Sequence, residues 1–213
     1  HGALALRSAA PYFPSNTVHL AVVDPGVGTA RSPIVVKTAH GTLVGPDNGL
    51  LAPAAEALGL QAIHCIDAAR WADQPGSSTF HGRDLFAPCA AALATGTPPE
   101  ELGEKVDTLV PLPIASPAIR DGSIRGEVIY IDRFGNLITN ISETELGSAT
   151  TFKAVRVGCH EAGPLQATYG SVATGRLVAL ISSWGHLEIA VRDGNAAATV
   201  GARVGDSVVA EVA

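Results

Sequence analysis

The sequence predicts an α/β N-terminal domain followed by an antiparallel β-barrel-like C-terminal domain, and three observations support this prediction. The chain has 213 residues, of which 46% are hydrophobic and 16% charged, so it can bury one large core or two modest ones. Its 23 glycines and 14 prolines suit short strands joined by tight turns. Helix-like and strand-like segments alternate up to residue 110, whereas short strand-like runs follow residue 122.

The elements of the first domain can be assigned in order along the chain. We expect a helix over 2–10, a buried strand over 18–23, and a hairpin formed by 34–37 and 42–44. Helix formers over 52–58 run up to Gly59, a residue typical of the position after a helix, and a strand over 62–66 follows. A polar loop over 77–84 then leads into a second helix that ends before Gly96 and holds Pro88 in its first turn.

Three prolines in the seven residues from Pro111 to Pro117 predict an extended linker. We therefore place the α/β domain at 1–110, the linker at 111–122 and the barrel domain at 123–213. Six runs in the last segment are separated by glycine or asparagine turns and predict an antiparallel sheet or small barrel. These runs are 126–131, 137–141, 152–157, 176–181, 186–191 and 207–212.

Charge and cysteine content narrow the possible partners. A net charge of −6 with only three lysines argues against a nucleic-acid surface and favours a small-molecule ligand. Cys65, Cys89 and Cys159 are odd in number and widely spaced, which predicts neither a disulfide framework nor a zinc site and favours the cytoplasm. No apolar run approaches the ~18–20 residues that a membrane span needs, so we expect no membrane association. The chain has no methionine and opens on His1 inside a predicted helix, so we expect its natural start to lie further upstream.

Four phrases stand in a characteristic order along the chain. They are V-V-D-P-G-V-G-T-A-R at 22–31, G-P-D-N-G-L-L at 45–51, T-F-H-G-R-D-L-F at 79–86 and I-D-R-F-G-N-L-I-T-N-I at 131–141. Together, and through S-S-W-G-H-L-E-I-A at 182–190, they resemble the S-adenosylmethionine hydroxide adenosyltransferases, relatives of fluorinating and chlorinating enzymes. The resemblance implies an α/β domain, a β-barrel domain, and a homotrimer with active sites at subunit interfaces. It also implies an upstream aspartate that holds the ribose hydroxyls and lies outside this sequence.

The resemblance further implies hydrolysis of S-adenosylmethionine at the ribose 5′-carbon, giving adenosine and methionine without a cofactor or a metal. It assigns the activation of water to a catalytic triad of Asp24, Arg31 and His81. These residue types suit the task, because a carboxylate and an imidazole can accept protons while a guanidinium favours hydroxide. The halogenating relatives place a tyrosine where this chain has Asp24 and replace His81-Gly82, so water is favoured over halide.

In the second domain the resemblance implies four substrate-binding residues. Asp132 is expected near the amino-acid ammonium, Phe134 and Asn136 around the adenine, and Ser183 near the methionine end. A carboxylate, an aromatic ring and an amide suit these roles chemically.

Simpler interpretations stay open beside these. Taken alone, Asp24 is a turn residue after a strand, Arg31 a solvated surface arginine and His81 a residue next to a helix start. The phrases 47–49 and Arg83-Asp84 are as consistent with turn and loop structure as with ligand binding. Gly26-x-Gly28 is no phosphate loop, the G-x-S-x-G elbow of serine hydrolases is missing, and the pairs 64–65 and 159–160 are poorly spaced for a metal. The competing functions are halide transfer from the same substrate and a non-catalytic adenosine-binding module.

Overall fold

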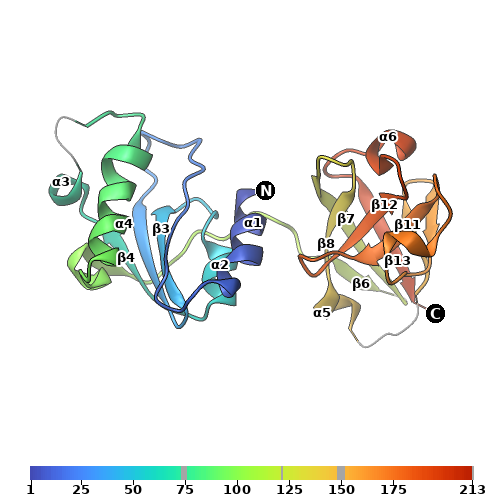
Figure 1. Ribbon diagram of the computed structural model, residues 1–213, viewed down its shortest axis with the longest axis horizontal. Helices are drawn as coiled ribbons and strands as arrows, with labels where there is room; N and C mark the ends of the chain where they lie inside the picture. Colours follow the sequence, from blue (N-terminus) through green and yellow to red (C-terminus); the bar gives the residue numbers. More distant parts are fainter. Residues whose placement is uncertain (73–75, 121, 148–151, 213) are drawn as a thin grey trace. The chain divides into compact units, whose positions relative to one another are not determined.

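The computed structural model describes residues 1–72, 76–120, 122–147 and 152–212, and it divides into two compact units, His1–Pro113 and Ile114–Ala213 (Figure 1). This division falls inside the segment 111–122 that we expect to be a linker. Within that segment Ala118–Arg120 forms strand β6, which pairs with strand β7 of the barrel. Asp121 in the expected linker and Ala213 at the end of the expected barrel domain lie outside the described residues.

The N-terminal unit contains a five-stranded mixed sheet with the strand order β1-β3-β2-β4-β5. Only the pair of β1 with β3 is parallel, and the other three pairs are antiparallel. The strands are β1 (Val18–Leu20), β2 (Pro33–Thr38), β3 (Gly41–Pro46), β4 (Leu60–Ile66) and β5 (Gly103–Val106). The helices are α1 (Gly2–Ala9), η1 (Ala10–Tyr12), α2 (Ala52–Ala57), α3 (Ala68–Trp71), η2 (Gly82–Phe86), α4 (Ala87–Ala94) and η3 (Pro99–Glu101).

Helices cover both faces of this sheet, which explains why its central strand is apolar on both sides. Successive side chains of a strand point to opposite faces. Ile34 and Val36 of β2 accordingly pack in the core beneath α1 and α2, whereas Val35 packs in a second core beneath α4. Figure 1 shows α4 and the α1–α2 pair on opposite sides of the strands. The predicted α/β class is confirmed for this unit.

The prediction of a buried strand over 18–23 is wrong in length and burial. Strand β1 ends at Leu20, and Val23 is 57% exposed. The reason is position: β1 lies at the end of the sheet and pairs with β3 alone. Residues 21–23 then carry the chain from this edge to Asp24.

The second helix begins earlier than predicted, with a widened π turn. The N–H of Ala87 donates to the carbonyl of Gly82, five residues before it, so η2 is wider than an α-helical turn. Pro88 has no N–H to donate to the carbonyl of Asp84, which removes one bond of the regular α-helical ladder. Asp84 was expected at the end of the loop and Phe86 near the start of the helix. In the structure both belong to the π turn, and both are buried.

The C-terminal unit is a barrel-like antiparallel sheet with the strand order β10-β9-β13-β7-β8-β12-β11, and β6 pairs with β7. A parallel bridge between Leu165 and Ala179 connects the segment after β10 to β11, so the sheet comes close to closing. Its strands are β6 (Ala118–Arg120), β7 (Ser123–Ile131), β8 (Leu137–Ser142), β9 (Phe152–Val157), β10 (His160–Gly163), β11 (Leu177–Ile181), β12 (His186–Val191) and β13 (Ser207–Val212). Three short helices accompany it, α5 (Glu143–Leu146), η4 (Tyr169–Ser171) and α6 (Ala196–Val200).

All six strands that the sequence predicts in this unit are present, and the predicted barrel-like class is confirmed. Their inward residues, among them Val128, Ile141, Leu187 and Ile189, form one core. Strands β6 and β10 were not expected, because they are short and carry few apolar residues. No helix in the described part of the chain has the length and apolarity to cross a membrane.

Candidate active site

Asp24 lies in a tight loop that folds back on itself. The N–H of Val27 donates to the Asp24 carbonyl at 3.2 Å, and the N–H of Thr29 donates to the Gly26 carbonyl at 3.1 Å. Gly28 between these turns has a φ of +78°, where a side chain is strained, and a Cβ there would lie 3.3 Å from the Ser78 carbonyl oxygen. The two turns bring Arg31 back over Asp24.

Arg31 and Asp24 form a forked ion pair that is largely withdrawn from solvent. Nε of Arg31 donates to Oδ2 and Oδ1 of Asp24 at 2.9 and 3.1 Å, and Nη2 donates to Oδ2 at 2.5 Å. The side chains are 9% and 6% exposed, respectively. A buried pair of this kind holds both groups in one geometry, because removing one partner leaves an uncompensated charge.

His81 completes the group from the start of η2. Its Nδ1 lies 2.9 Å from Nη2 of Arg31. A guanidinium is always protonated and only donates, so Nδ1 must accept this hydrogen bond. As a hydrogen bond, the contact therefore places the ring proton on Nε2.

The loop before His81 is held by Asp84 and Arg83. The Asp84 carboxylate accepts from the N–H of Ser77 at 2.6 Å and from Nε and Nη2 of Arg83 at 2.5 and 3.0 Å. These two partners, Arg83 first, hold the pKa of Asp84 below its ordinary value. Of the two interpretations left open by the sequence, these contacts match the structural one.

The phrase 47–49 also has structural contacts, one of which reaches the candidate site. Nδ2 of Asn48 donates to the carbonyl of Val23 at 2.9 Å, and the N–H of Leu50 donates to Oδ1 of Asn48. Oδ1 of Asp47 accepts from the N–H of Val110 at 2.8 Å. Asn48 thus holds Val23, the residue before Asp24, in place. The position of Asn48 in a turn motif did not predict this contact.

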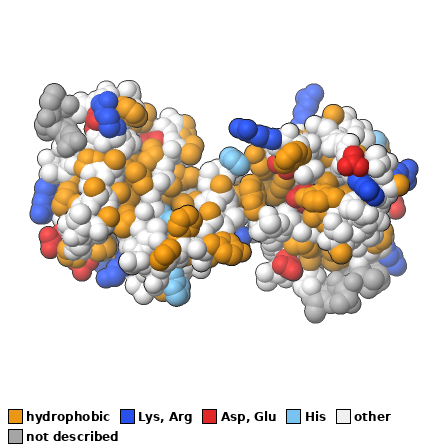
Figure 2. Space-filling model, viewed as in Figure 1, with side chains coloured by type: hydrophobic (Ala, Val, Ile, Leu, Met, Phe, Trp, Pro, Cys, Tyr) orange, Lys and Arg blue, Asp and Glu red, His pale blue; other side chains and the backbone are white. Residues whose placement is uncertain are grey.

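Apolar side chains flank this buried polar group at the surface. Val22, Val23 and Phe80 are exposed, and Val22 lies next to Gly82, whose added Cβ would meet it at 3.6 Å. Apolar side chains are visible at the surface of the N-terminal unit in Figure 2. A few converging polar groups among apolar surface are typical of ligand sites.

In the C-terminal unit, Asp132 organises the turn between β7 and β8. Its Oδ1 accepts from the N–H groups of Phe134 and Asn136 at 2.8 and 2.9 Å, and its Oδ2 accepts from Nδ2 of Asn136 at 3.0 Å. The Phe134 ring is consequently held outward, with the residue 75% exposed, while Asn136 is buried.

Phe134 and Asn136 line a groove of about 630 Å³, which also involves Tyr169 and residues 191–194. The structure thus brings these two predicted residues together next to Asp132. Ser183 is exposed in the turn between β11 and β12 and is not among the described residues that line this groove.

The structure adds a buried pair that the sequence analysis missed, Tyr169 and Glu188. The Tyr169 hydroxyl donates to Oε1 of Glu188 at 2.7 Å, and Glu188 is only 4% exposed. Burial raises the pKa of Glu188, and the charge of Asp132 adds to this effect. Burial, followed by the contact with Glu188, also raises the pKa of Tyr169. A lone acid within the apolar run 186–191 was the available sequence signal.

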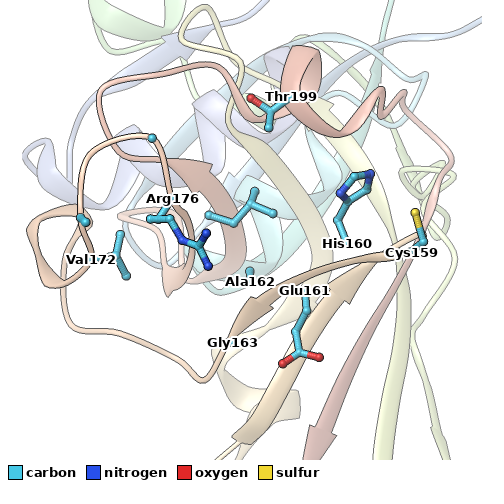
Figure 3. A pocket seen from close by; sticks show the side chains of 11 residues that line it. Cys159, His160, Glu161, Ala162, Gly163, Val172, Arg176 and Thr199 are labelled. Atoms are coloured by element: carbon cyan, nitrogen blue, oxygen red, sulfur yellow. The ribbon is translucent and has the colours of Figure 1, made fainter.

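A second groove on the barrel, of about 810 Å³, contains the Cys159-His160 pair (Figure 3). Its labelled side chains come from the β9–β10 hairpin, the segment before β11 and α6. Cys159 is an exposed free thiol. Across the described ranges, no three His, Cys, Asp or Glu side chains are grouped so that they could hold a metal ion.

Comparison with known proteins matches this chain to one family. Residues 1–103 match the SAM hydroxide adenosyltransferase N-terminal domain, and residues 126–209 match the C-terminal domain. The (R)-S-adenosyl-L-methionine hydrolase of Salinispora tropica is 43% identical over 96% of this chain and 78% of its own length. The protein of the same name from Thermus thermophilus is 44% identical over 95% of this chain and 79% of its own length.

A structural comparison agrees. The crystal structure of an uncharacterized conserved protein from Thermotoga maritima superposes with a TM-score of 0.85 at 37% identity, covering 98% of this chain and 82% of that one. The fluorinase of Nocardia brasiliensis is more distant, at 26% identity over 94% of this chain and 78% of its own length. The chain belongs to the SAM hydroxide adenosyltransferase family.

Proposed function

We propose that this protein hydrolyses S-adenosylmethionine at the 5′-carbon of the ribose and releases adenosine and methionine. The observation that carries the proposal is the buried contact of Arg31 with both Asp24 and His81. The hydrolase relatives at 43% and 44% identity support it, since their names describe this reaction class.

In the proposed reaction Asp24 takes a proton from water, and the water oxygen attacks the 5′-carbon from the side opposite sulfur. The carbon–sulfur bond breaks with its electron pair on sulfur, so the sulfonium becomes the thioether of methionine. Sulfonium is already a good leaving group, so the enzyme needs chiefly to position and activate the nucleophile. Oδ1 of Asp24 accepts only from Nε of Arg31 among the described residues, which leaves it lone pairs for this proton.

His81 and Arg31 act on the oxygen that attacks. Because Nδ1 of His81 is occupied by Arg31, its Nε2–H is a donor that can orient the water and stabilise the forming hydroxide. The positive charge of Arg31 also favours hydroxide. Attack of hydroxide on a sulfonium merges opposite charges, and a site poor in water strengthens their attraction.

We propose that the substrate is held by the residues of the C-terminal unit. The exposed face of Phe134 stacks on the adenine, and Oδ1 of Asn136 accepts from its amino group because Nδ2 is engaged by Asp132. Asp132 uses its remaining lone pair for the substrate ammonium, and Ser183 contacts the methionine end. We further propose a cytoplasmic homotrimer with active sites at subunit interfaces, and a reaction that needs neither cofactor nor metal.

Oxygen-18 water tests the reaction directly. Incubation with S-adenosylmethionine should place the label in the 5′-hydroxyl of adenosine, and in none of the methionine. Asp24→Asn should bind the substrate in calorimetry yet release little adenosine. Unlabelled adenosine from the wild type would contradict direct attack of water on the 5′-carbon.

Added chloride separates the competing functions in the same assay. Formation of 5′-chloro-5′-deoxyadenosine would identify halide transfer, whereas binding of adenosine with no turnover would identify a binding module. We expect adenosine as the sole nucleoside product.

A further inference from the structure

We propose that Phe86 is a positioning residue for Arg31, whose guanidinium it holds between Asp24 and His81. The activity part of this proposal rests on the proposed function, while its structural part does not. The carbon centre of the Arg31 guanidinium lies 5.1 Å from the centroid of the Phe86 ring. Phe86 is fully buried, and Arg31 is the triad residue whose contact with its ring connects it to the site.

The contact is compatible with the hydrogen bonds that Nε and Nη2 of Arg31 make to Asp24 and His81. A guanidinium is planar and donates from its edges, so an aromatic ring against its face does not compete with Asp24 or His81. A cation over a ring is attracted by the electron-rich face, more strongly when both are withdrawn from water. Arg31 meets that condition, because its side chain is 9% exposed.

The widened turn η2 supplies both partners of Arg31 on this side. His81 precedes the turn, Phe86 ends it, and one hydrogen bond from Ala87 to Gly82 spans the residues between them. The ring is fixed in turn by the core beneath α4, which includes Val35, Val44 and Leu102. Arg31 belongs to an irregular loop, but through Phe86 its guanidinium contacts the packed core beneath α4.

Graded fluorination of the Phe86 ring tests this role, because fluorine withdraws electron density from the face and changes the ring volume little. Wild type, 4-fluoro-, 3,5-difluoro- and pentafluorophenylalanine at position 86 should show a stepwise fall in kcat. A cation–π contact of ordinary strength predicts a total loss of about twofold to thirtyfold. KM for S-adenosylmethionine should stay within about twofold, since the ring touches no substrate.

Fluorination of Phe152 is the matched control. Phe152 is also buried, in the core of the C-terminal unit, and no Arg–ring contact is found for it among the described residues. The same series there should leave kcat unchanged. A kcat that does not depend on fluorination at position 86, in protein of unchanged melting temperature, would overturn the proposal.

Phe86→Leu gives a readout that needs no turnover. Nitrogen-15 NMR of His81 should report the Nε2–H tautomer in the wild type and a mixture of tautomers or imidazolium in Phe86→Leu, because Arg31 is no longer held against Nδ1. Leu93→Ala shortens an apolar side chain of the same core without removing an aromatic ring, so it should destabilise the fold and leave the His81 signals unchanged.

The combined outcomes distinguish the two proposals. Changed His81 signals in Phe86→Leu with a wild type that does not turn over substrate would uphold the positioning role and remove the proposed function. Unchanged His81 signals together with unchanged kcat would remove the positioning role alone.

Discussion

Nη2 of Arg31 lies 2.9 Å from Nδ1 of His81, and this contact determines what the other ring nitrogen can do. A neutral imidazole has one donor and one acceptor nitrogen. With the acceptor turned to Arg31, the donor is left for the ligand side. In the proposed reaction the triad therefore divides its tasks, with Asp24 as proton acceptor and His81 as hydrogen-bond donor.

Replacement of His81 by two different residues separates orientation from catalysis. In His81→Asn the amide oxygen can accept from Arg31 as Nδ1 does, but no donor replaces Nε2. We expect kcat to fall by about 100-fold or more in both His81→Asn and His81→Ala, with a lower melting temperature in His81→Ala alone. Wild-type kcat in His81→Asn would show that the ring only orients Arg31.

Arg31→Lys keeps the charge and removes the fork. A lysine ammonium cannot donate to both Asp24 oxygens and to His81 in one plane, so we expect kcat to fall by about 100-fold and the melting temperature to drop. Arg156→Lys is the control, because Nε and Nη2 of Arg156 both donate to Oε2 of Glu161 at an exposed position. Steady-state kinetics and thermal unfolding of both variants check this, and equal effects on kcat would argue against a special role of Arg31.

Phe134→Ala tests the proposed adenine contact without disturbing the core. The ring is 75% exposed, so its removal should leave the melting temperature within about 2 °C and raise KM for S-adenosylmethionine by about tenfold. Ile119→Ala, at 65% exposure in the same unit, should change neither quantity. A KM unaffected by Phe134→Ala would place the adenine elsewhere.

Glu188 should make stability depend on pH. Burial raises its pKa in the folded state above the unfolded value, so the folded protein favours the neutral acid. The stabilising contribution is complete below the unfolded pKa and is lost as pH rises through the folded pKa. In Glu188→Gln the side chain stays neutral, and its amide oxygen can still accept from Tyr169.

The variant should therefore gain stability relative to wild type as pH rises from about 4 to 7, by about 1.4 kcal/mol for each unit of pKa elevation. Urea unfolding at several pH values measures this difference. Glu56→Gln, at an exposed position of α2, should show no such trend. A constant difference between Glu188→Gln and wild type would mean that burial does not govern the Glu188 carboxyl.

The three thiols should react at different rates. Burial raises the pKa of Cys89 to about 11, whereas Cys159 is exposed. At pH 8 a disulfide reagent should modify Cys159 rapidly and leave Cys89 unmodified until the protein unfolds. Cys159→Ser should abolish the rapid phase, and survival of that phase in Cys159→Ser would assign it to Cys65.

The sequence could predict the elements whose pattern is local. The hairpin of β2 and β3 and the six long barrel strands follow from apolar periodicity and turn residues, and these survive as predicted. The extent of β1 could not be predicted, because whether an apolar run is buried depends on its neighbours in the sheet. The widened turn at Gly82–Phe86 could not be predicted either, because Pro88 is as consistent with the first turn of a helix as with a π turn before it.

Asp24, Arg31 and His81 were named from the sequence, and the structure brings these three side chains into contact, but their geometry could not be predicted. The four phrases pointed to Asp24, Arg31 and His81, yet no spacing along the chain reveals which nitrogen of His81 faces Arg31. Asp132 shows the converse, because its carboxylate closes a turn through three hydrogen bonds that a ligand role did not anticipate. Phe86 meets Arg31 only in the folded chain and carries no local signal of that contact, whereas Glu188 is marked in the sequence only as a lone acid in the apolar run 186–191.

The extra residue in η2 sets the relative positions of His81, which precedes the turn, and Phe86, which ends it in the core. Deleting one residue from the turn would return it to a regular α-helical path, in which the ring of Pro88 would clash with the carbonyl four residues before it. The chain before Pro88 would have to shift to relieve this clash, and His81, which contacts Arg31, lies in that part of the chain. We therefore expect functional variants to carry substitutions in η2 but no deletions or insertions.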